Sequence, residues 1–148
     1  MKFSHGFDIK YFMSELVDDK IQVHEHCVDL TVKEIFRLSG GYEIDFSGNE
    51  HMTASKEKIE PEKRNKDDKY GWWTLEPGIY MFQYNEQLMM SGTQRAIIQV
   101  HSHLMEGGAS HPTIVVEQTG DLFVPVTVFH DFKIKQNARV SEIRILQA

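Results

Sequence analysis

The sequence has a single cysteine, four prolines and no long apolar run. One cysteine, Cys27, excludes an intramolecular disulfide and fits a reducing compartment. No apolar stretch approaches the roughly 18 residues that a membrane-spanning helix needs. The N-terminus also shows no apolar region of the kind that secretory signals carry. These absences predict a cytoplasmic protein without a membrane partner.

The sequence also has fewer basic than acidic residues. There are 16 Lys and Arg against 22 Asp and Glu, which gives a formal net charge of −6. A general nucleic-acid-binding protein would carry a basic surface, so nucleic acid is not an expected partner. An acidic protein can still bind a triphosphate through a few local Arg and Lys side chains or a bridging Mg²⁺. The length predicts one domain over residues 1–148.

Hydrophobic periodicity changes along the chain. Ile9, Phe12 and Leu16 recur at helical spacing, which predicts an amphipathic helix over residues 8–20. Beyond it the apolar period becomes two. Strands are predicted at residues 28–33, 42–46, 79–84, 95–101, 113–117, 122–129, 132–134 and 140–146.

Short strands separated by turn residues are typical of a sandwich or barrel. The predicted fold class is therefore all-β, jelly-roll-like, with one N-terminal helix. Residues 47–70 interrupt this pattern, because they contain almost no aliphatic side chains and many charges of both signs. Their composition predicts an exposed, mobile loop. A lid or a partner contact is the alternative interpretation.

Two polar residues lie at the predicted strand over residues 28–33. Asp29 must be hydrogen-bonded or paired if it is buried, and we interpret it as structural. Cys27 lacks the cationic neighbours that make a thiol nucleophilic, apart from His24 and His26, so no catalytic role is expected for it.

Four short blocks carry a resemblance to a known family. They are Cys-Val-Asp-Leu at 27–30, Pro-Gly-Ile-Tyr at 77–80 with Glu86 after it, His-Ser-His-Leu-Met-Glu-Gly-Gly at 101–108, and Val-Glu-Gln-Thr-Gly at 116–120. In this order they resemble the trimeric dUTPase and dCTP deaminase superfamily over residues 8–46 and 72–146. The resemblance implies a dUTPase/dCTP deaminase-type barrel and homotrimers with sites between subunits.

The resemblance also implies a deoxynucleoside triphosphate as ligand, with Mg²⁺ on its phosphates. The family signature Arg-Ser-Ser-Leu-x-Arg-x-Gly falls on residues 101–108. Ser102 would then contact the phosphates, while His101 and Glu106 take the places of the two arginines. In dUTPases an aspartate before a glycine activates the attacking water, and Glu117 is its nearest counterpart here.

Deamination of dCTP is disfavoured by the same comparison. The glutamate that shuttles protons in the deaminases falls on Pro125 or Thr127, and neither side chain acts as a general acid or base. If the protein is an enzyme, a dUTPase-like hydrolase of nucleotide metabolism is expected. The alternative is a non-catalytic member that binds a nucleotide or a protein on the inherited scaffold.

Histidine is abundant and offers a third hypothesis. Two His-x-His pairs occur, His24 with His26 and His101 with His103. Residues i and i+2 of a strand point to one face, so each pair could give two imidazoles to one metal. This would resemble a cupin, another small jelly roll. The other interpretation makes these histidines polar strand-end or turn residues, some at a subunit interface.

Overall fold

The computed structural model describes residues 1–148 and consists mainly of antiparallel strands. The strands are β1 (Lys2–Phe3), β2 (Met13–Ser14), β3 (Val28–Ser39), β4 (Ser55–Ile59), β5 (Trp72–Leu75), β6 (Gly78–Leu88), β7 (Gln94–Val100), β8 (Ala109–Ser110), β9 (Ile114–Val116), β10 (Gly120–Val128), β11 (Phe132–Lys135) and β12 (Arg139–Gln147). The helices are α1 (Gly6–Ile9), α2 (Asp19–Gln22) and α3 (Ser102–Glu106), and a 3₁₀ turn covers Lys10–Phe12. None of these helices has the length and apolar character needed to cross a membrane.

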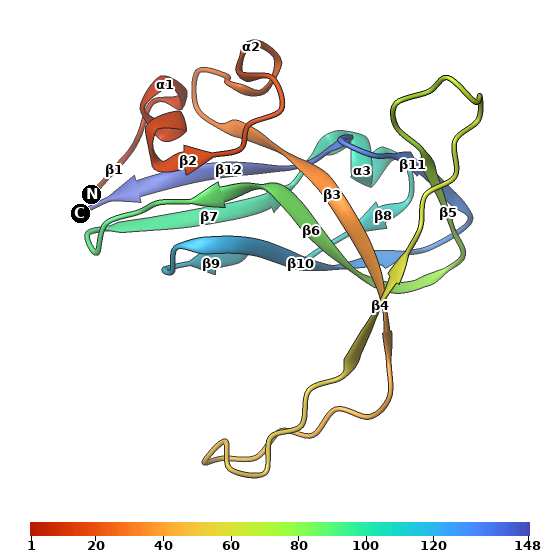
Figure 1. Cartoon of the computed structure of the whole chain (residues 1–148). Coiled ribbons are helices and arrows are strands. Elements are labelled where there is room, and N and C mark those ends of the chain that lie inside the picture. Colours follow the sequence, from red (N-terminus) through yellow and green to blue (C-terminus); the bar gives the residue numbers. More distant parts are fainter.

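Ten strands form one curved sheet, which gives the half-barrel of Figure 1. Its main path runs β8-β10-β6-β3-β12-β7-β9, while β1, β2 and β4 add to β12, β6 and β3. β5 and β11 form a separate pair. Pairing of β1 with β12 places the two chain ends side by side (Figure 1). The predicted mostly-β fold class is confirmed.

The core lies inside this curved sheet. Alternate side chains of β6 and β10 point inward, so their burial follows the period of two that the sequence predicts. Together with residues of β3, β7 and β12 they contribute to one cluster of 25 buried apolar residues. Each Val, Leu, Ile or Phe buried there contributes about 1.5–3 kcal/mol relative to an exposed position. This cluster positions the polar groups described below.

The predicted strands at 28–33 and from residue 79 onward are present, while other parts of the chain differ from the prediction. β5 was not predicted as a strand. Residues 42–46 form no strand, and only an isolated bridge joins Glu43 to Met52.

The continuous helix predicted over residues 8–20 does not form. Helical backbone ends at Phe12, and Met13–Ser14 pairs as β2 with the end of β6. Glu15 then adopts φ 65°, a left-handed conformation that an α-helix does not contain. Ile9 is nevertheless fully buried, because the apolar side chains pack against the sheet in short turns and a strand.

The charged segment over residues 47–70 is exposed but contains a strand. β4 pairs with the second half of β3, from Ile35 opposite Ile59 to Ser39 opposite Ser55. The resulting hairpin projects away from the rest of the molecule (Figure 1). Its charged, outward side chains explain why composition alone predicts a loop.

Candidate functional site

α3 carries most of the segment that resembles the phosphate signature. His101 caps this helix, because its Nδ1 accepts a hydrogen bond of 3.0 Å from the backbone N–H of His103. Ser102 and Glu106 are exposed, whereas His101 is buried. Three of the four residues expected in the site therefore lie together on this short segment.

A cleft of about 320 Å³ lies beside α3. Three permanent cations, Lys133, Lys135 and Arg139, line it together with His103, and no carboxylate does. Such a concentration of one sign is unexpected on a chain of net charge −6. A cleft lined by charge of one sign concentrates ions of the opposite sign, so this cleft suits an anion. The full lining is Trp72, His103, Leu104, Phe132, Lys133, Ile134, Lys135, Ala138, Arg139 and Val140.

The strand pair β5–β11 places two of the cations. Lys133 and Lys135 flank the buried Ile134, so both lysines point outward from the same face. Lys135 lies opposite Trp72 in the register, with its Nζ 5.8 Å from the ring centroid. The guanidinium of Arg64 lies 3.5 Å from the centroid of that indole. Each exposed cation–π contact contributes about 0.5–1 kcal/mol, so Trp72 helps to hold cations at this edge.

Arg139 is held by a buried carboxylate. Its Nη1 lies 3.1 Å from Oδ2 of Asp29, and Nε2 of His24 lies 2.8 Å from the same oxygen. Asp29 is 1% exposed, so it is paired as a buried carboxylate must be. Nε2 of His101 lies 3.7 Å from Oδ1 of Asp29. Burial lowers the pKa of His101, which favours its neutral form beneath α3.

Glu86, which follows the Pro-Gly block, is fully buried and does not face the cleft. Its carboxylate accepts hydrogen bonds of 2.6 Å from both the backbone N–H and the hydroxyl of Thr31. Gln22 donates to Glu86 at 3.2 Å and to the backbone oxygen of Asp29 at 2.8 Å. Burial raises the pKa of Glu86. This buried network joins α2, β3 and β6 and does not line the cleft.

Glu117 lies elsewhere in the chain. It follows β9, and its Oε1 lies 2.8 Å from Nε of Arg95. Arg95 precedes His101 by six residues of extended chain, a separation of roughly 20 Å. Within one chain the structure therefore does not bring Glu117 together with Ser102, His101 and Glu106.

The outward face of β10 holds the positions matched to the deaminase glutamate. Pro125 is exposed and Thr127 is half-buried, and neither can transfer a proton. The one carboxylate on this face of β10, Asp121, accepts a hydrogen bond of 2.6 Å from Gln87.

The two His-x-His pairs do not converge on a metal site. His24 contacts Asp29, whereas His26 is exposed beside Glu25. His101 is buried and His103 lines the cleft. The single group of three potential metal ligands contains Cys27, Asp29 and Glu142, with no histidine. The cupin-type hypothesis therefore finds no histidine cluster in the structure.

Sequence reasoning missed the cations of the cleft. A local signal for two of them exists in Lys133-Ile134-Lys135, whose alternation predicts two lysines on one strand face. No local signal places that face beside α3, because the cleft is formed by segments about 30 residues apart in sequence.

Comparisons with known proteins agree with the fold. The chain is similar to a protein named probable deoxyuridine 5′-triphosphate nucleotidohydrolase from Methanosarcina mazei, with 29% identity over 135 residues, 88% of this chain and 75% of that protein. A protein of the same name from Methanosarcina acetivorans is 28% identical over 137 residues, 90% of this chain and 77% of that protein. No family model matches the chain.

Among solved structures, the fold resembles that of 2′-deoxycytidine 5′-triphosphate deaminase from Agrobacterium tumefaciens. The TM-score is 0.70 at 14% identity, and the match covers 99% of this chain. At 14% identity the likeness concerns the fold alone, and this chain spans 48% of the length of that deaminase. The sequence relatives match over most of the chain, which is a distant relative of probable dUTP nucleotidohydrolases and has the fold of the dUTPase/dCTP deaminase superfamily.

Proposed function

We propose that the protein binds a deoxynucleoside triphosphate with its phosphates in the cationic cleft beside α3. The observation that carries this proposal is the set of Lys133, Lys135 and Arg139 around a cleft without carboxylates. Hydrogen bonds between such cations and phosphate are roughly twice as strong as neutral ones. Ser102 is exposed on α3 directly before His103, which lines the cleft, and its hydroxyl would be a further phosphate ligand.

The cleft cations compensate for the departures from the family signature. His101 and Glu106 stand where that signature has arginines, and the positive charge comes here from β11 and the start of β12. Mg²⁺ prefers oxygen ligands from phosphates and one or two carboxylates. Glu106, exposed on α3, is the carboxylate that would help to hold it, and the ion would supply further positive charge to the phosphates.

A complete site requires a second copy of the chain. A general base must lie within hydrogen-bond reach of the water it activates, and Glu117 is roughly 20 Å of strand away from α3. In a homotrimer, Glu117 of one subunit would serve the cleft of its neighbour. Both side chains of its ion pair with Arg95 are exposed, and such a pair contributes less than about 1 kcal/mol. The carboxylate of Glu117 can therefore leave Arg95 at little cost in free energy.

Hydrolysis is favoured over deamination as the reaction. The sequence relatives carry the name of probable dUTP nucleotidohydrolases, and the outward face of β10 lacks a proton shuttle at Pro125 and Thr127. Glu117 would accept a proton from the water that attacks a phosphorus atom. The second candidate, a nucleotide-binding member without catalysis, is favoured by the roughly 20 Å of strand that separate Glu117 from α3 within one chain.

The binding proposal is tested by calorimetry with dUTP, dCTP and the other deoxynucleoside triphosphates in Mg²⁺. The double variant Lys133→Gln/Lys135→Gln should weaken binding at least roughly 10- to 100-fold, because each hydrogen bond to a charged group contributes about 1.5–3 kcal/mol. Lys56→Gln/Lys58→Gln is the matched control, since these lysines also alternate on an exposed strand. Equal affinity of all three proteins would rule out the cleft as the phosphate site.

The catalytic part is tested by release of phosphate or pyrophosphate. Glu117→Gln should lower kcat at least about 100-fold and leave nucleotide affinity unchanged, as expected for a general base. A wild-type protein that binds but does not hydrolyse supports the non-catalytic candidate. Light scattering that finds only monomers over a wide concentration range would exclude a shared site.

A further inference from the structure

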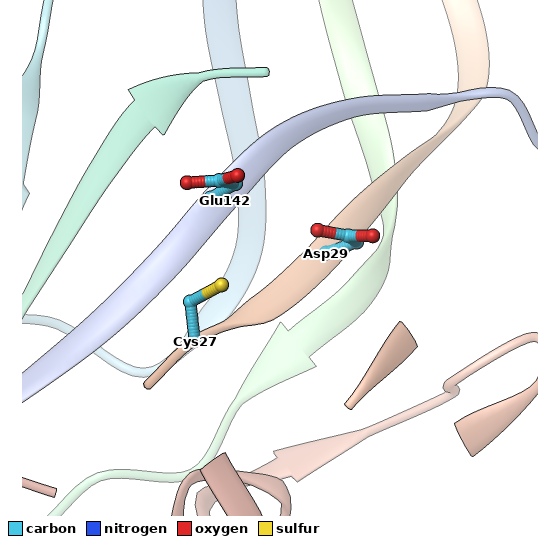
Figure 2. Close-up of side chains that lie close together, drawn as sticks. All are labelled: Cys27, Asp29 and Glu142. Atoms are coloured by element: carbon cyan, nitrogen blue, oxygen red, sulfur yellow. The ribbon is translucent and has the colours of Figure 1, made fainter. Parts of the chain in front are cut away.

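Three potential metal ligands meet where β3 begins beside β12 (Figure 2). Cys27 directly precedes β3, and Asp29 follows two residues later on the same face. Glu142 lies opposite Asp29 in the register between β3 and β12. One ligand atom from each side chain lies within 4.8 Å of the other two. Figure 2 shows the thiol of Cys27 pointing toward the space between the two carboxyl groups.

One oxygen of this cluster lacks a partner. Oδ1 of Asp29 is buried and has no hydrogen bond, while Oδ2 contacts His24 and Arg139. Nε2 of His101 is 3.7 Å from Oδ1, too far for a hydrogen bond. A buried polar atom without a partner is unfavourable, and native structures contain few of them. The open oxygen lies in the group that already holds a thiol and a second carboxylate, which indicates a place for a cation.

We propose that Cys27, Asp29 and Glu142 bind a Zn²⁺ ion that joins β3 to β12. A thiolate selects Zn²⁺ over Mg²⁺ or Ca²⁺, and carboxylate oxygens complete a mixed ligand set that Zn²⁺ accepts. Ligand atoms around tetrahedral Zn²⁺ stand roughly 3.3–3.8 Å apart, given bond lengths of about 2.0–2.3 Å. Side-chain rotation that brings separations of up to 4.8 Å into this range would therefore complete the site, with water as the fourth ligand.

The surrounding residues fit this assignment. Nδ1 of His101 accepts the capping hydrogen bond from His103, so the proton of its neutral ring is on Nε2. His101 therefore has no free ring nitrogen for the metal and lies outside the ligand set, 3.7 Å from Oδ1 of Asp29. Arg139 and Arg144 each pair with one carboxylate, at 3.1 and 3.2 Å, and balance part of the negative charge that remains after the thiol loses its proton.

The site is tested on the full-length wild-type chain, freed of metal and titrated with Co²⁺ and then Zn²⁺. Because Cys27 is the sole cysteine, a thiolate-to-cobalt charge-transfer absorption can arise only from this residue. We expect one Co²⁺ per chain with that absorption, and its loss when Zn²⁺ displaces Co²⁺. Zn²⁺ at about one hundred times its Kd should raise the unfolding midpoint by roughly 5–10 °C. Cobalt bound without the thiolate absorption, or no binding, would overturn the proposal without any variant.

Two variants test the contributions of Cys27 and Glu142 to metal binding. Cys27→Ser and Glu142→Gln should each weaken Zn²⁺ binding more than about 100-fold, since even second-shell changes cost 10- to 100-fold. Glu34→Gln is the matched control, because Glu34 is also a strand carboxylate paired with a cation, Lys58 at 3.3 Å. Unchanged Zn²⁺ affinity in folded Glu142→Gln would remove Glu142 from the site and contradict the assignment. Neither result depends on nucleotide binding, so the two proposals stand or fall separately.

Discussion

The two halves of β3 lie in opposite environments. All five residues over 28–32 are buried, and this half pairs mainly with β12. Exposure alternates over residues 33–39, which pair with β6 and with β4 in the projecting hairpin. The buried half carries Asp29 and Thr31 inside the molecule, so its polar groups must find every partner there. In the hairpin half only Ile35 is buried, and the other side chains are exposed or partly exposed. The position of a residue along β3 therefore decides how much a substitution lowers the free energy of unfolding.

The largest effect should come from Asp29→Ala. Removing this carboxylate takes away the shared partner of Arg139 and His24, whose side chains are 33% and 46% exposed, so the loss is about 1.5–3 kcal/mol, as for hydrogen bonds to a charged group. Urea unfolding of the metal-free protein measures the loss. Glu34→Ala in the hairpin half should cost less than about 1 kcal/mol, because its partner Lys58 is half exposed. Similar losses in both variants would contradict the comparison.

Thr31→Val should cause the second largest loss of stability. The hydroxyl of Thr31 donates to Glu86 at 2.6 Å and accepts from Asn85 at 2.9 Å, and valine makes neither bond. A buried group left without its partner costs about 1–3 kcal/mol, read from the same unfolding curves. The control Thr74→Val lies exposed on β5 and should stay within about 0.5 kcal/mol. A Thr31→Val protein as stable as wild type would show that the backbone N–H of Thr31 and the side chain of Gln22 are enough to satisfy Glu86.

These polar partners mark the limit of what sequence can predict here. Period-two burial is local, so the strands over residues 79–84 and 122–129 follow from their own side chains. The Asp29–Arg139 pair joins residues 110 apart in sequence, and the residues next to Asp29 give no indication that Arg139 is its partner. Four blocks in order identify the family. They could not locate the cations of the cleft, because Lys133 and Lys135 lie outside those blocks.

The next largest effect should be a pH dependence of the free energy of unfolding that comes from a buried histidine and not from an exposed one. His111 is buried, and since the backbone oxygen of Pro112 only accepts, Nδ1 donates to it and Nε2 accepts from Ser141. Burial lowers the pKa of His111 below its ordinary value of 6.5. The unfolded chain thus takes up this proton first as pH falls, so stability decreases below pH 6.5.

Urea unfolding at pH values from 7.5 downward measures this dependence. His111→Asn should make the decline below pH 6.5 shallower, because the buried group that resists protonation is gone. Part of the decline should remain, since burial lowers the pKa of His101 as well. His51→Asn, in the exposed hairpin tip, is the matched control. A wild-type profile in His111→Asn would assign the pH dependence to other groups.

The smallest effect should come from truncating the tip of the hairpin, residues 40–54. Ser39 and Ser55 are register partners, so a two-residue Asn-Gly turn can join them directly. The unfolding midpoint should stay within about 3 °C of wild type, because the removed apolar side chains, such as Ile44 and Phe46, are exposed. Extending the deletion through Ile59 should cost clearly more, since its carbonyl accepts a 2.7 Å hydrogen bond from the buried Trp73. A tip-truncated protein that loses its oligomeric state by light scattering would show that another copy covers those exposed side chains.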